Sequence, residues 1–242
     1  MLNLRKHRTQ QQTMANSGLL GSSIAKKYWM SLTGLFLISF LIVHLLGNLQ
    51  LLDLSAEGQE QFNIYAKFMT SFPLIKITSY FLYASIVFHA VDGIYLAIQN
   101  RKARPERYAS YKPNRNSIWA SRNMGLLGTI ILAFIILHMS QFWYTMHWGE
   151  IGMDANGNKD LAAVVIKTYQ DGTAGLIMAL LYVIAMAAVA FHLYHGFQSA
   201  FQTLGINHNR YTPLIKKVGA AFSIIVPLAY AIIPVFVLMA KN

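Results

Sequence analysis

Long apolar segments alternate with polar connections along this chain. Five segments approach the ~20 residues that a helix needs to cross the hydrocarbon core of a membrane. Membrane helices tolerate internal glycine and proline, and Pro227 and Pro234 are expected to kink the fifth segment. The pattern predicts an all-α integral membrane protein, a bundle of five transmembrane helices forming one domain over residues 1–242. The predicted spans cover residues 28–51, 73–98, 123–144, 173–201 and 218–240.

The charges in the connections predict how the bundle is oriented. Lysine and arginine dominate the N-terminal arm (residues 1–25), the connection between spans II and III and that between spans IV and V, whereas the other two connections carry more acids. Connections rich in lysine and arginine stay in the cytoplasm. The N-terminus is therefore predicted to be cytoplasmic and the C-terminus outside. The polar arm lacks the apolar run of a signal peptide, so no cleavable signal is expected.

Composition narrows the possible functions. The chain is 55% hydrophobic and 12% charged, about half the charged fraction of a soluble domain. The net charge of +11 lies in the connections rather than on one continuous face, so we expect contact with membrane lipid and no nucleic acid. Cysteine is absent, which excludes disulfides, thiolate-bound clusters and covalently attached haem. The acidic stretch at residues 154–158 lacks the ligand spacing of a calcium loop and is read as a solvated turn.

Four histidines lie inside the predicted spans, in two matched patterns. His44 and His138 each end the pattern G-x5-F-x3-H, while His89 and His192 each open the pattern F-H-x3-G-x3-A. Ionisable side chains within a membrane are costly and usually functional. The repeated patterns therefore mark these four residues as the candidate site.

The predicted topology places the four histidines at two depths. His44 lies about 16 residues, roughly 24 Å, along a span that enters from inside, and His138 lies about as deep in span III. Spans II and IV run the opposite way, so His89 and His192 lie near the inner face. Two levels result, which we call the outer pair (His44 and His138) and the inner pair (His89 and His192).

Two neutral imidazoles on opposing helices are the ligands of a bis-histidine haem. Gly93 and Gly196 follow His89 and His192 by one turn and would leave room for a flat macrocycle. Gly34 and Gly128 precede their histidines by almost three turns and are expected to serve helix packing. We therefore interpret the four histidines as axial ligands of two haem irons, in a protein that carries electrons through a membrane.

Other interpretations of single residues remain open. A lone histidine in a span is often a hydrogen-bonded group or a proton relay. His195 lies three residues after His192 and could face the same pocket, although only His192 fits the repeated pattern. Asp92 could orient His89, pair with a basic residue, or reach water at the inner interface.

At this point the chain resembles the cytochrome b membrane anchor of succinate dehydrogenases and fumarate reductases, in its five-helix, two-haem form. The most specific part is His192-x3-Gly196-x8-Gly205, which matches the ligand-helix pattern of that family, and Ser31-Leu32-Thr33-Gly34 is similar to its first helix. The resemblance implies haem ligation by His44 with His138 and by His89 with His192, two b haems, and menaquinone as substrate. It also implies a flavoprotein and an iron–sulfur protein docked on the cytoplasmic side of a bacterial cytoplasmic membrane.

Some candidate functional residues are selected only by their charge or by their depth in the predicted spans. Lys26, Lys27 and Arg122 are candidate partners of the inner haem propionates. Candidate quinone contacts near the outer level are Asn48, Gln50, Gln141, Trp143 and His147. Glu57 and Glu60 lie in the loop where some members of the family carry a proton-handling glutamate. The alternatives are a dihaem cytochrome b of another membrane oxidoreductase, of the nitrate reductase, hydrogenase or cytochrome b561 type, and a transporter that uses a histidine relay.

Overall fold

The computed structural model describes residues 23–102 and 118–240. Within these ranges it is helical apart from turns and one isolated bridge, Met153 to Lys159, and five helices are long and apolar enough to cross a membrane. The predicted fold class is confirmed. Most of the N-terminal arm and the basic residues at 103–117 lie outside the described residues. The long helices are α2 (Ser23–Asn48), α4 (Pro73–Lys102), α7 (Met124–His138), α10 (Gly172–Thr203) and α11 (Thr212–Met239).

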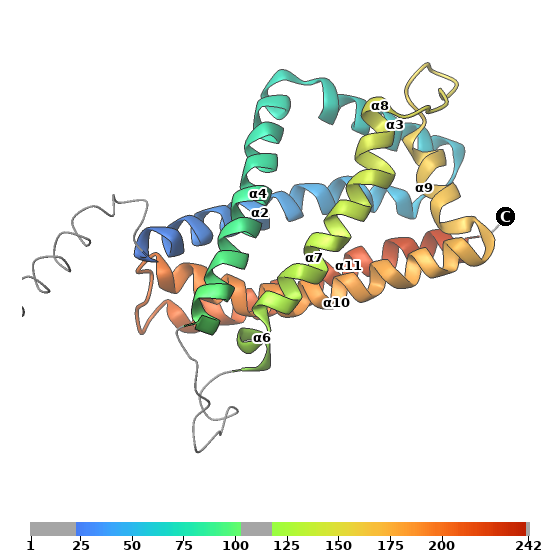
Figure 1. Ribbon diagram of the computed structural model, residues 1–242. Coiled ribbons are helices and arrows are strands. Elements are labelled where there is room, and N and C mark those ends of the chain that lie inside the picture. The colour runs from blue at the N-terminus through green and yellow to red at the C-terminus, as the bar shows by residue number, and fades with distance from the viewer. Residues whose placement is uncertain (1–22, 103–117, 241–242) are drawn as a thin grey trace, which may run out of the picture.

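The long helices form the bundle drawn in Figure 1. Helix α10 lies along α11 and also contacts α2 and α7, while α4 packs on α2 and α7. Large apolar side chains such as Phe81 and Phe88 are exposed on the outside of the bundle, as expected where lipid is the solvent. Four of these helices, α2, α4, α7 and α10, each carry one histidine of the repeated patterns.

Two shorter helices lie where the sequence indicated only loops. Helix α3 (Ala56–Ser71) and helix α9 (Leu161–Gln170) pack together beside the end of α7, at what we call the outer end after the predicted topology (Figure 1). Each begins at a capping side chain: Ser55 accepts from Gly58 N, and Asp160 accepts from Ala163 N. Such caps satisfy free backbone donors of the first turn.

The acidic turn before α9 is exposed at residues 155–157, as the sequence predicted, and it is also anchored to α3. Asn63 of α3 is 1% exposed; its Nδ2 donates to Asp160 Oδ1 at 3.0 Å and its Oδ1 accepts from Ala162 N at 2.9 Å. Asp154 accepts from the backbone N–H of Asn158 at 2.8 Å. This hydrogen bond is the main cause that holds the pKa of Asp154 below its usual value. The turn thus closes over α3 as part of the fold.

Replacing Asn63 by alanine is expected to loosen this outer layer. The change leaves the Ala162 N–H without its partner and removes one of the two donors to Asp160 Oδ1, which costs about 1–3 kcal/mol. Limited proteolysis of the detergent-solubilised protein at residues 149–160 measures the effect, with Lys167→Ala, an exposed position on α9, as the control. Equal cleavage rates in the two variants would contradict the anchoring role.

Several helix boundaries differ from those predicted, since α2 begins at Ser23 rather than at 28 and α4 ends at Lys102 rather than at 98. Span III continues past His138 through a π-helical turn (Met139–Trp143) and α8 (Tyr144–Trp148). Helix α11 begins at Thr212 rather than at 218, with a proline in its first turn, and Pro227 and Pro234 are buried inside it without ending it. Helix α10 ends where Gly205 adopts a φ of 78°, the left-handed conformation that glycine supplies at helix ends. This is the second glycine of the H-x3-G-x8-G motif.

Candidate functional site

The outer pair brings together two helices that are far apart in the sequence. The ring centres of His44 on α2 and His138 on α7 lie 5.7 Å apart, at an interplanar angle of 84°. Phe40 stacks on His44 at 5.1 Å and Phe134 lies 5.7 Å from His138. The repeated F-x3-H pattern therefore places an aromatic ring beside each outer histidine, one turn earlier on its own helix.

The inner pair is built in the same way from the other two helices. The ring centres of His89 on α4 and His192 on α10 lie 6.1 Å apart, at 64°. The phenylalanines of the F-H pattern, Phe88 and Phe191, are 63% and 50% exposed, and Phe191 packs against Trp119 at 5.4 Å, so they do not flank the inner pair as Phe40 and Phe134 flank the outer pair. His195 follows one turn after His192 and is half-buried.

Gly34 and Gly128 lie against the inner pair. A Cβ atom added to Gly34 would lie 3.2 Å from Cε1 of His89, and one added to Gly128 would lie 4.0 Å from Cε1 of His192. Gly34 thus leaves space beside the imidazole of a neighbouring helix, whereas a Cβ at Gly128 would make only an ordinary contact. On both α2 and α7, ten residues, or ~15 Å of helix, separate this glycine from the outer histidine. The two pairs are therefore about 15 Å apart along the bundle.

A hydroxyl group orients one imidazole of the inner pair. Thr33 Oγ1 donates its hydrogen to Trp29 O at 2.7 Å and lies 3.2 Å from His89 Nδ1. A hydroxyl has only one hydrogen, and the shorter distance to Trp29 O favours the arrangement in which Thr33 accepts from His89 Nδ1–H. The Nε2 atom of His89 then carries the lone pair that a metal requires.

A second hydroxyl does the same in the outer pair. Tyr182 Oη donates to Gln141 Oε1 at 2.7 Å and lies 3.2 Å from His138 Nδ1. Gln141 Nε2 donates in turn to Met178 Sδ at 3.0 Å, which turns the amide oxygen toward Tyr182. His138 Nδ1–H is therefore the donor to Tyr182, and Nε2 of His138 is free.

The remaining two imidazoles have less defined partners. Asn48 Nδ2 lies 3.4 and 3.5 Å from the ring nitrogens of His44 and donates to His44 O at 2.7 Å, so it fixes neither ring nitrogen. His192 Nδ1 is the only buried side-chain polar atom without a hydrogen-bond partner in residues 23–102 and 118–240. Orphaned polar atoms of this kind are rare in buried sites.

The imidazole spacing fits a shared iron. Two imidazoles that bind one metal ion from opposite sides, each with a metal–nitrogen distance of ~2.0 Å, have ring centres on the order of 6 Å apart. The observed 5.7 and 6.1 Å agree with this value. Gly196 offers open space, since a Cβ added to it would meet nothing within 4 Å, whereas one added to Gly93 would lie 3.6 Å from Met30 Cε. The residues therefore fit two bis-histidine haems.

The candidate propionate partners lie at the end of the bundle nearer the inner pair. Lys26 Nζ sits over the ring of Tyr95 at 3.7 Å. Lys27, next in α2, is exposed, and Arg122 ends α6 (Trp119–Arg122). Asp92 is half-buried one turn beyond His89.

The candidate quinone contacts separate into two groups. Asn48 and Gln141 bond within the surroundings of the outer pair, as described above. Trp143 Nε1 donates to Tyr83 Oη at 2.8 Å, and His147 Nδ1 donates to Trp143 O at 2.8 Å. His147 itself is exposed. Gln50 lies in the short 3-10 turn η2 (Leu49–Leu52) that follows α2 and is half-buried.

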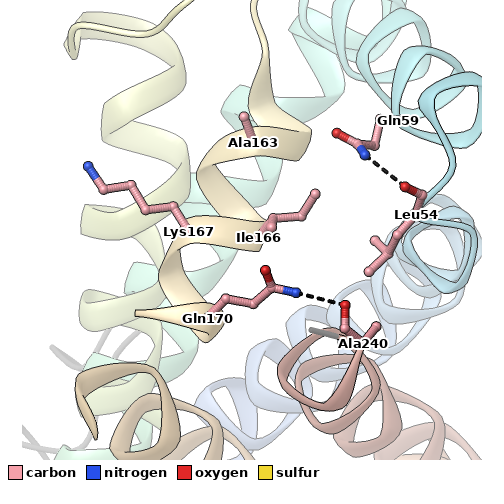
Figure 2. A pocket seen from close by; sticks show the side chains of 7 residues that line it. All are labelled: Leu54, Gln59, Ala163, Ile166, Lys167, Gln170 and Ala240. Atoms are coloured by element: carbon pink, nitrogen blue, oxygen red, sulfur yellow. Dashed lines mark hydrogen bonds between the residues drawn. The ribbon is translucent and has the colours of Figure 1, made fainter. Parts of the chain in front are cut away.

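An open groove at the outer end is separate from these residues. It lies between α9, the end of α11 and the connection from η2 to α3 (Figure 2). Gln170 Nε2 donates to Val237 O at 2.9 Å and so satisfies a free carbonyl at the end of α11. Gln59 Nε2 donates to Leu54 O at 2.8 Å. The lining residues are Leu54, Gln59, Ala163, Ile166, Lys167, Gln170 and Ala240.

Among known proteins, one similarity bears on this geometry. The chain is similar to a succinate dehydrogenase cytochrome b558 subunit. That protein, from Bacillus subtilis (strain 168), is 26% identical over 191 residues, which cover 78% of this chain and 82% of the subunit. No protein-family profile matches the chain, and no solved structure matches it. The similarity to the Bacillus subtilis subunit supports the resemblance drawn from the histidine motifs.

Proposed function

We propose that this chain is the cytochrome b membrane anchor of a succinate:quinone oxidoreductase. In this proposal His44 and His138 hold an outer b haem, and His89 and His192 hold an inner one. The observation that carries the proposal is the meeting of four intramembrane histidines as two ring pairs at two levels. The similarity to a succinate dehydrogenase cytochrome b558 subunit supports the choice of enzyme.

The residues of the chain define what such a site does. Haem, when bound, supplies one-electron transfer. With both imidazoles of a pair bound to it, the iron would have no open coordination position, so oxygen and substrate would be kept from it. The hydroxyls of Thr33 and Tyr182 hold one imidazole of each pair in the tautomer that presents Nε2. Dicarboxylate chemistry belongs to other subunits.

The partners follow from the predicted orientation. A flavoprotein and an iron–sulfur protein dock at the cytoplasmic end, on the basic connections, and the protein lies in a bacterial cytoplasmic membrane. Menaquinone exchanges electrons at the outer end, near exposed His147 and the Trp143 side chain. Electron flow from succinate to quinone and flow toward fumarate use the same two haem levels.

Purification of the native complex tests this proposal. The chain is isolated from membranes in mild detergent, its partners are identified, and succinate is added anaerobically. We expect a flavoprotein and an iron–sulfur protein to copurify, and succinate to generate the reduced bands of b-type haem. A coloured complex that responds to formate, nitrate or hydrogen but not to succinate would instead assign the chain to another dihaem enzyme. A colourless protein without partners would favour a histidine-relay transporter.

A further inference from the structure

Tyr182 occupies the centre of the outer level although it belongs to the helix of an inner ligand. It lies on α10 ten residues before His192, or ~15 Å along the helix, which brings it level with the outer pair. The side chain is 6% exposed. Its ring packs edge-on against Phe134 at 4.9 Å and lies 6.0 Å from the ring of His138.

The Tyr182 hydroxyl bonds to three side chains, those of His138, Gln141 and Tyr169. It accepts from His138 Nδ1 at 3.2 Å and donates to Gln141 Oε1 at 2.7 Å. Gln141 lies on the π-helical turn that directly follows His138. Turns of this kind are often found at functional sites, and here the turn brings Gln141 back toward α10.

We infer that Tyr182, held by Gln141, is a positioning residue that sets the electron donation of His138 to the outer haem iron. This inference rests on the proposed haem ligation. A hydrogen bond from Nδ1–H to an acceptor raises the basicity of the ligating nitrogen. A more basic ligand stabilises the ferric state and lowers the reduction potential. Thr33 holds the matching position on His89, so each hydroxyl acts on the potential of its own haem.

Potentiometric titration of the complete membrane complex tests the inference. Tyr182→Phe removes the acceptor and is expected to raise the midpoint potential of the outer haem alone. We expect a three- to tenfold change in its oxidised-to-reduced ratio at fixed potential, and tenfold is ~59 mV for a one-electron couple. Thr33→Val should raise the potential of the inner haem alone.

Gln141→Glu gives a shift of opposite sign. A carboxylate accepts the Tyr182 hydrogen more strongly than an amide does, which makes the hydroxyl oxygen a better acceptor for His138 Nδ1–H. The outer potential should therefore fall in this variant. It retains Tyr182, so the inference stays testable if Tyr182→Phe fails to assemble.

Tyr230→Phe is the matched control, because Tyr230 Oη donates to Leu41 O at 2.7 Å while its ring lies 6.0 Å from that of His44. This substitution removes a hydroxyl from the same level without changing a contact to a ring nitrogen. At fixed potential, the oxidised-to-reduced ratio of each haem should therefore change by less than threefold. Two haems with unshifted or equally shifted potentials in Tyr182→Phe, or an unchanged or raised outer potential in Gln141→Glu, would overturn this inference alone. Preparations without haem would overturn the proposed function instead.

Discussion

Replacing His192 by alanine is expected to remove the inner haem and to leave the outer haem in place. His192 is one of two rings that meet at the inner level, and alanine offers no nitrogen to iron. The outer pair is ~15 Å away along the helices, so its ligands are not disturbed. The absorption spectrum of the purified variant, reduced with dithionite and normalised to protein, should retain about half of the wild-type haem.

His195→Ala is the matched control for this experiment. It removes an imidazole one turn further along the same helix, where the ring is half-buried. The haem content of this variant should equal that of the wild type. Loss of one haem in His195→Ala but not in His192→Ala would reverse the assignment of the ligand on α10.

Replacing Gly34 by leucine is expected to remove the inner haem even though Gly34 is ten residues from a proposed ligand on its own helix. A Cβ at this position already lies 3.2 Å from Cε1 of His89, and the remaining leucine atoms would occupy the space of the imidazole. Displacing the ring by as little as an ångström takes Nε2 out of bonding distance of a shared iron. Haem content and the two resolved midpoint potentials measure the effect.

Two further variants calibrate the Gly34 result. Gly34→Ala requires the His89 ring to yield by only a few tenths of an ångström, so it should retain the inner haem with a shifted potential. Ser39→Leu adds the same side chain at an exposed position of the same helix and should retain both haems. Loss of the outer haem rather than the inner one in Gly34→Leu would contradict the proximity of α2 to His89.

The hydrophobic pattern predicts the membrane helices well because a bilayer imposes length and apolarity on each helix separately. The pairing of helices at two depths also follows from the sequence, since the four histidines stand at fixed positions in spans of alternating direction. The short helices α3 and α9 were missed. Their formation depends on caps at Ser55 and Asp160 and on the contact through Asn63, which hydropathy does not detect.

The groups that orient the imidazoles could not be predicted from the sequence. Thr33 and His89 are 56 residues apart, and Tyr182 and His138 are 44 apart, so only the tertiary structure brings them together. The contact of Gly34 with His89 could not be predicted for the same reason, because the ring that Gly34 faces belongs to a neighbouring helix. Thr33 was visible only as part of the stretch Ser31-Leu32-Thr33-Gly34 that resembles the first helix of the family, and nothing in the sequence singled out Tyr182.

The number of haems per chain tests the central claim most directly. The complete complex is purified, the chain is quantified by amino-acid analysis, and non-covalent haem is measured as its pyridine complex. Two histidine pairs at two levels predict two b haems for each copy of this chain, both low-spin in the ferric state. One haem or none in the fully assembled complex would contradict the account.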